Sequence, residues 1–131
     1  MKGRPIHQRL GFALAGLIEA HVRESSFRVH VRTLSATLAV LLVVRPAPIW
    51  WAAIAIVAAL VLALEMLNSA LEGLIDLLHP AIHPEVKVIK DMASAAVLVA
   101  GIGAAAVAVC ALVDSWPRLM AEWHWLMGAI R

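Results

Sequence analysis

Three mainly apolar stretches dominate the chain, and a turn or loop that contains two prolines separates each from the next. A helix needs about 20 apolar residues to cross the hydrocarbon core of a bilayer. The pattern therefore predicts three membrane-spanning helices at residues 27–45, 49–78 and 86–114. The first is the weakest, because only the twelve residues 33–44 lack Arg and Lys. It can span the membrane if the arginines before this segment lie at headgroup level with their aliphatic stems buried.

The second predicted helix is longer than a bilayer requires. Its 30 residues would extend about 45 Å, whereas the hydrocarbon core is about 30 Å thick. Its last turns, which carry Glu72 and Asp76, should therefore stand in the headgroup zone. Residues 45–48 and 79–84 each contain two prolines, which are excluded from helix interiors and predict turns.

The two ends of the chain are less apolar than the three spans. In residues 5–23, polar side chains interrupt apolar ones, a pattern typical of an amphipathic helix on a membrane surface. Residues 115–131 are rich in Trp and Met and predict an interfacial tail on the other side. No repeat or second domain is visible, so we expect residues 1–131 to form a single all-α membrane domain.

The composition agrees with an integral membrane protein. Hydrophobic residues make up 63% and charged residues 15% of the 131 positions, whereas soluble domains have about a quarter charged residues. No cleavable signal peptide is expected, because charged residues interrupt the first 26 positions. The single cysteine, Cys110, has apolar neighbours, and we interpret it as a packing residue.

The distribution of positive charge predicts the orientation. Six of the eleven Lys and Arg residues lie in the first 32 positions, and Lys87 and Lys90 lie between the second and third spans. The positive-inside rule then places the N-terminus and this loop in the cytoplasm and the C-terminus in the periplasm. We therefore expect a multi-pass protein of a bacterial cytoplasmic (inner) membrane, with no nucleic-acid partner.

Four polar residues follow one another at helical spacing near the end of the second span: Glu65, Asn68, Glu72 and Asp76. Steps of three and four residues put them on one helix face. Ionisable groups are costly in membrane helices and therefore indicate a functional site. Glu65 lies deepest, where a carboxylate can act as a general base or be neutralised by a packing partner. Glu72 and Asp76 could bind a cation or form a solvated helix end.

The neighbouring residues indicate phosphate and a divalent metal. Mg²⁺ prefers oxygen ligands and usually takes one or two carboxylates together with substrate phosphates. Glu24 offers another carboxylate on the same side, unless it pairs with Arg28, and Lys90 and Asp91 could hold phosphate or anchor the helix. Together these residues fit metal-assisted phosphoryl transfer to a lipid hydroxyl.

Other chemistries are disfavoured. The sequence lacks the GxxxxGK[ST] loop of P-loop nucleotide sites. His79 and His83 are four residues apart, but each is followed by proline, which argues against a helical zinc pair.

Three sequence blocks resemble the small prokaryotic diacylglycerol kinases. The most specific is LEMLNSALEGLID (64–76), which is similar to the family pattern E-x-x-N-[ST]-A-[IL]-E-x-x-x-D. KDMASAAVL (90–98) and RESSFRVH (23–30) resemble two further blocks, in the same order and at the same spacing. The resemblance covers about residues 10–113 and implies an ATP- and Mg²⁺-dependent lipid kinase. It further implies a homotrimeric helical bundle with active sites shared between subunits.

The resemblance also implies roles for individual residues. Glu65 would be the catalytic base for the hydroxyl of the lipid, and Glu24 and Glu72 would bind Mg²⁺. The nucleotide site would consist of Glu24, Asn68, Glu72, Asp76, Ala81, Ile82, His83, Lys90 and Asp91. The lipid substrate would lie near Glu65, Phe27, Arg28 and Ser94.

The lipid substrate stays open at this point. Diacylglycerol, giving phosphatidic acid, is the first expectation, but FRVH (27–30) and HPEVKVIKD (83–91) look closer to the branch that phosphorylates undecaprenol. Pro5 stands where the family has an arginine, and residues 13–15 lack the polar and aromatic side chains of the family's surface helix. A non-catalytic membrane subunit with a polar partner-binding face is the remaining alternative.

Overall fold

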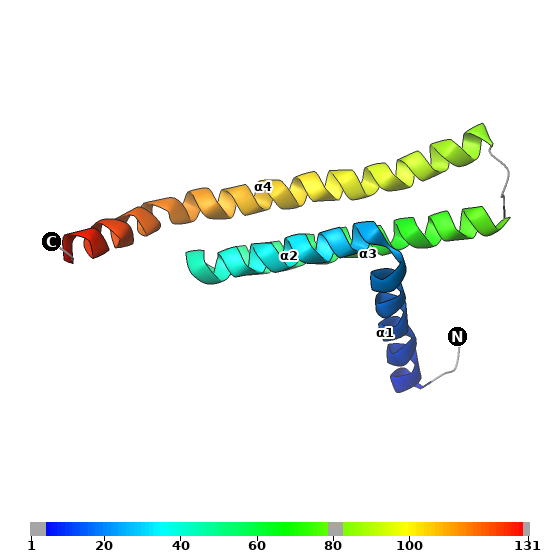
Figure 1. Ribbon diagram of the computed structural model, residues 1–131, viewed down its shortest axis with the longest axis horizontal. Coiled ribbons are helices and arrows are strands. Elements are labelled where there is room, and N and C mark those ends of the chain that lie inside the picture. The colour runs from blue at the N-terminus through cyan, green and yellow to red at the C-terminus, as the bar shows by residue number, and fades with distance from the viewer. Residues whose placement is uncertain (1–4, 79–82, 130–131) are drawn as a thin grey trace.

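The computed structural model describes residues 5–78 and 83–129, which form four α-helices and contain no strand. The helices are α1 (Ile6–Arg23), α2 (Ser25–Val44), α3 (Pro48–Leu78) and α4 (Pro84–Ala129). Figure 1 shows α2, α3 and α4 running side by side, while α1 points away from them at the start of α2. The contact between α3 and α4 is the most extensive, and α2 packs against both.

Three of the helices, α2, α3 and α4, are long and apolar enough to cross a membrane. This confirms the prediction of an all-helical protein with three long apolar helices. Much of their surface is apolar and exposed, for example at Val43 (77%) and Ile56 (69%), so lipid or another protein surface must cover it. The position of α1 on a membrane surface and the homotrimer stay predictions.

The corner between α1 and α2 is held by the side chain of Arg28. Glu24 has an extended backbone, with φ −95° and ψ 116°, and it separates the two helices. The last carbonyls of a helix lack intrahelical donors. Arg28 Nη1 donates to two of those in α1, His21 O at 3.0 Å and Val22 O at 2.9 Å. Phe27 is buried beside them, with its ring edge-on to His21.

The turn between α2 and α3 depends on a second arginine, which comes from α4. Arg45 adopts the left-handed conformation, with φ 48°, which is uncommon for a residue with a side chain. Arg118 Nη2 donates to the carbonyl oxygens of Val44 at 2.6 Å and Arg45 at 2.5 Å. The end of α2 is thereby tied to a helix more than 70 positions away in the sequence.

A small core lies next to this turn. Leu41, Ile54 and Ala111 are buried there, one from each of the three long helices, and Trp50 packs against them. The indole Nε1 of Trp50 also donates to Asp114 Oδ2 at 2.9 Å. Because Trp favours the membrane–water interface, we expect this contact to lie at the interface opposite the Glu65 end of α3.

The last helix is longer than the predicted third span. It has 46 residues, or about 69 Å. It includes the segment 115–129 and is not interrupted at Pro117. A proline inside a helix removes one backbone donor but does not by itself end the helix. The nearby hydroxyl of Ser115 donates back to Ala111 O at 2.7 Å and is buried. The described part of the predicted tail is therefore a continuation of α4.

Replacing Arg118 with Met should loosen α4 from the end of α2. Methionine keeps an apolar stem but cannot donate, and a hydrogen bond from a charged donor contributes about 1.5–3 kcal/mol. We expect the thermal unfolding midpoint in detergent micelles to fall by several degrees. Arg23→Met is the matched control, because Arg23 forms an exposed pair with Glu19 and such pairs contribute little. Equal shifts for both variants would contradict a special role for Arg118.

Candidate active site

A cavity of about 560 Å³ lies between α2, α3 and α4, close to the corner with α1. One wall is polar and comes from the start of α2 and from α3, and the other wall comes from α4. The α4 wall is mainly apolar, and its most polar member is Ser94. The other polar side chains that line the cavity are Glu24, Ser26, His30, Glu65, Asn68, Ser69 and Glu72.

The helical spacing of α3 explains why three of the predicted residues meet in this cavity. Glu65, Asn68 and Glu72 are separated by three and four residues, so they project from one face. The sequence therefore predicts that they lie together, and the structure places them in a single cavity. Glu24 enters the cavity from the break between α1 and α2, and Ser94 enters it from α4.

Glu65 is the most deeply placed carboxylate of the site. Only 4% of the residue is exposed. Its Oε2 lies 3.6 Å from Nε2 of His30, which is on the neighbouring helix α2. A buried charge is costly unless it is paired, so this histidine is a significant part of the environment of Glu65.

The amide of Asn68 is only partly satisfied. Its Nδ2 donates to Glu72 Oε1 at 3.1 Å, which fixes the orientation of both side chains. Its Oδ1 is buried and has no hydrogen-bond partner among the described residues. Buried polar atoms in native proteins nearly always have a partner. A bound ligand with a donor, or a cation, would supply one here.

Asp76, Lys90 and Asp91 lie outside the cavity, at the open end of the α3–α4 hairpin. Lys90 Nζ contacts Asp76 Oδ1 at 2.5 Å and joins the end of α3 to the start of α4. Asp91 pairs with Lys87 of its own helix, also at 2.5 Å. The structure thus places these residues on the helices of the cavity but outside its lining, where Asp76 pairs with Lys90 and Asp91 pairs with Lys87.

The remaining predicted residues have other neighbours. Phe27 and Arg28 support the α1–α2 corner. His83 Nδ1 accepts from the backbone N–H of Glu85 at 3.2 Å, at the start of α4. Ala81 and Ile82 lie outside the described residues.

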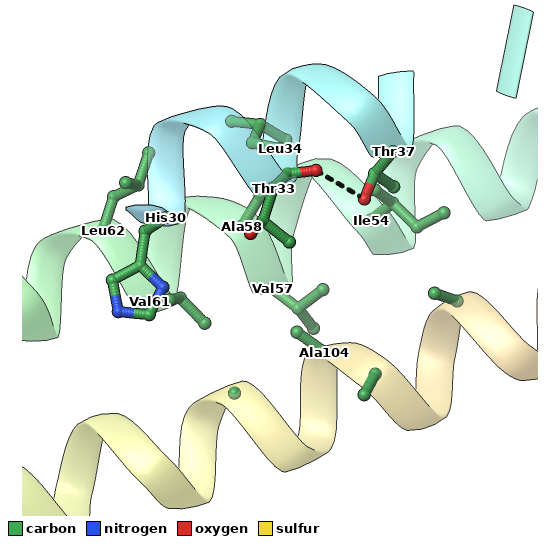
Figure 2. Close-up of a pocket in the computed structure, with 13 residues that line it drawn as sticks. His30, Thr33, Leu34, Thr37, Ile54, Val57, Ala58, Val61, Leu62 and Ala104 are labelled. Atoms are coloured by element: carbon green, nitrogen blue, oxygen red, sulfur yellow. Dashed lines mark hydrogen bonds between the residues drawn. The ribbon is translucent and has the colours of Figure 1, made fainter. Parts of the chain in front are cut away.

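His30, for which no role in the site is predicted from the sequence, lines two cavities in the structure. Besides the polar cavity, it lines a smaller apolar one of about 160 Å³ between the three long helices (Figure 2). His30, Gly101 and Ala105 border both cavities. His30 ends the block RESSFRVH (23–30), but its contact with Glu65 depends on how α2 packs on α3 and cannot be predicted from that block.

The described residues contain no cluster of three His, Cys, Asp or Glu side chains that could hold a metal by itself. Glu24 and Glu72 are nevertheless two carboxylates on one cavity, beside the unsatisfied Oδ1 of Asn68. Mg²⁺ typically takes one or two carboxylates and completes its shell with water and phosphate oxygens. This donor set therefore fits Mg²⁺ that arrives together with a phosphate ligand.

Comparison with known proteins also indicates a kinase family. Residues 11–112 match the family model described as prokaryotic diacylglycerol kinase, and all the candidate residues lie within that range. The chain is also 36% identical over 110 residues to a protein from Synechocystis sp. that is named diacylglycerol kinase. The match covers 83% of this chain and 63% of that relative, so the chain spans less than two thirds of the relative's length. No solved structure matches the chain.

Proposed function

Because the chain belongs to the prokaryotic diacylglycerol kinase family, we propose that it is an ATP- and Mg²⁺-dependent lipid kinase. The proposed reaction transfers the γ-phosphoryl group of ATP to the primary hydroxyl of diacylglycerol and gives phosphatidic acid. The observation that carries the proposal is the single cavity in which buried Glu65 lies beside Glu24, Asn68 and Glu72.

Glu65 is the proposed catalytic base. One of its carboxylate oxygens accepts the proton of the lipid hydroxyl while the hydroxyl oxygen attacks the γ-phosphorus. The new O–P bond forms as the bond from the γ-phosphorus to the β–γ bridging oxygen breaks, and ADP leaves. The buried position of Glu65 supports this role. Proton transfer requires the base to lie at hydrogen-bond distance from the hydroxyl, and the hydroxyl of a membrane lipid lies at the edge of the membrane.

Glu24 and Glu72 are the proposed Mg²⁺ ligands, and both line the cavity. Bound Mg²⁺ would neutralise the charge on the phosphates of ATP. Asn68 holds Glu72 through its amide Nδ2, which fixes the carboxylate for that role. Its buried Oδ1 would be available to a donor on the nucleotide or to the metal.

The proposed nucleotide site extends to the open end of the hairpin. Asp76, Lys90, Asp91 and the loop residues 81–83 would complete it. Lys90 is paired with Asp76, so a phosphate that binds Lys90 must replace or share that partner. Such exchange costs little at a partly exposed pair.

Phe27, Arg28 and Ser94 are the residues proposed to lie near the lipid. Ser94 lines the cavity directly. Phe27 and Arg28 act by holding the corner that places Glu24.

Because so much apolar surface is exposed on one chain, we further propose that the protein assembles as a homotrimer in the bacterial inner membrane. Its active sites would then be shared between subunits, with the N-terminus in the cytoplasm.

Undecaprenol is the second candidate substrate. It also presents a primary hydroxyl at the interface, so the same residues would serve. The observation in its favour is the apolar cavity of about 160 Å³ that adjoins the Glu65 cavity, because a space of this small volume can take part of one hydrocarbon chain more easily than parts of two. The name of the Synechocystis relative favours diacylglycerol.

The purified protein should transfer phosphate from MgATP to a lipid alcohol, with diacylglycerol preferred over undecaprenol. Both lipids are presented at equal mole fraction in the same mixed micelles, and labelled phosphate in the lipid product is measured. A clear preference for undecaprenol would replace the first substrate by the second. Transfer to neither lipid would contradict the kinase function.

Glu65→Gln should abolish this transfer while the protein still folds. The amide is nearly isosteric but cannot accept the hydroxyl proton, and loss of a general base typically costs about 10²–10⁴-fold in rate. The measurements are the turnover rate and, as a control, the unfolding midpoint and the elution volume in detergent. A folded Glu65→Gln protein with full activity would remove Glu65 as the base and would leave a packing role for it.

Glu72→Gln should raise the Mg²⁺ concentration needed for half-maximal activity and the KM for MgATP more than the KM for lipid. The change removes one charged ligand but keeps a side chain that can accept from Asn68. Glu122→Gln, an exposed position near the end of α4, is the matched control and should titrate like the unchanged protein. An unchanged Mg²⁺ titration for Glu72→Gln would contradict its assignment as a ligand.

A further inference from the structure

His30 occupies a special position in the candidate site. It lies on α2, and its imidazole points into the space between α3 and α4, beside Val61 (Figure 2). It borders both the polar cavity that holds Glu65 and the apolar cavity below it. A lipid whose hydroxyl reaches Glu65 and whose chain occupies the apolar cavity would pass close to this ring.

Three other nitrogen donors near the site are already engaged. Lys90 is paired with Asp76, and Arg28 donates to the carbonyls of α1. Asn68 uses its Nδ2 on Glu72. His30 instead contacts the Glu65 carboxylate, with Nε2 3.6 Å from Oε2.

The remaining charged groups around the cavity cannot replace it. Besides His30, the titratable groups that line the cavity are Glu65, Glu24 at the start of α2 and Glu72 on α3. The lining residues of α4 are uncharged. Two further carboxylates would repel the Glu65 carboxylate rather than orient it.

We propose that His30 is a positioning residue for Glu65, a proposal that rests on the kinase function above. The Nε2–H of His30 donates to Oε2 of Glu65 and holds the carboxylate so that Oε1 faces the lipid hydroxyl. The proton of the hydroxyl goes to Glu65, and His30 keeps its own proton. The ring acts on the reaction only through the orientation of this carboxylate.

The observed distance is close to that of a hydrogen bond. At 3.6 Å, Nε2 of His30 and Oε2 of Glu65 are slightly farther apart than in a hydrogen bond. The proposed role therefore needs only a small approach of the two side chains. Positioning is valuable because a displacement of about 1 Å can cost about 100-fold in rate.

The kinetic test compares His30→Leu with His30→Gln in the full-length protein, using the better of the two lipids. Leucine cannot donate, so kcat should fall about 10- to 100-fold while the KM for MgATP stays within about twofold. Glutamine can donate from a similar position and should restore most of kcat. His124→Leu, the same change at an exposed site far along α4, should leave activity unchanged.

A double-mutant comparison separates positioning from packing. If His30 acts through Glu65, adding His30→Leu to Glu65→Gln should reduce the residual rate no further. A further loss in that background, or equal losses for the Gln and Leu variants, would overturn the proposal. So would a loss that only follows a lowered unfolding midpoint.

A spectroscopic measurement tests the contact without any activity. In protein labelled with ¹⁵N-histidine in lipid nanodiscs, His30→Gln identifies the ring signals of His30. Glu65→Gln should then shift the Nε2 signal, whereas Glu72→Gln should not. An unmoved signal would overturn the proposal. If the unchanged protein phosphorylates neither lipid while the signal still moves, the kinase function is what fails, and with it the catalytic purpose of the contact.

Discussion

Hydrocarbon offers no hydrogen-bond partners to a peptide backbone, and this constraint organises the whole chain. Each membrane-crossing segment must be helical, and the difficult places are the helix ends, where carbonyls lack intrahelical donors. Two arginines meet this demand. Arg28 covers the end of α1, and Arg118 reaches from α4 to the end of α2. The corner that supports the polar cavity and the turn at the opposite end of the bundle are therefore fixed by the same kind of contact.

The same lack of hydrogen-bond partners in hydrocarbon bears on the function of the polar cavity. If the face of α3 served packing alone, an apolar residue at the position of Glu65 would serve as well, because apolar packing is often at least as stabilising as a buried ion pair. The fold instead surrounds it with a histidine and two further carboxylates. An arrangement that is unfavourable by itself would become less so with a bound cation, in keeping with the proposed reaction site.

The local sequence pattern was enough to predict the features that depend on a single helix. The three apolar helices follow from hydropathy, and the shared face of Glu65, Asn68 and Glu72 follows from their spacing. The contact of His30 with Glu65 could not be predicted in this way, because it depends on the rotation of α2 against α3. The Arg118 contacts span more than 70 positions, and α4 continues through Pro117 although a proline is typical of helix ends. The local signals at these sites are weak or point to a different structure.

The absence of a side chain at Gly101 of α4 adds to the width of both cavities. Gly101 borders both cavities, and a Cβ built at this position meets no other atom within 4 Å. An alanine here would favour the helix by up to about 1 kcal/mol and would narrow the space available to a ligand. One substitution at this position would therefore change both the stability of α4 and the space open to a ligand.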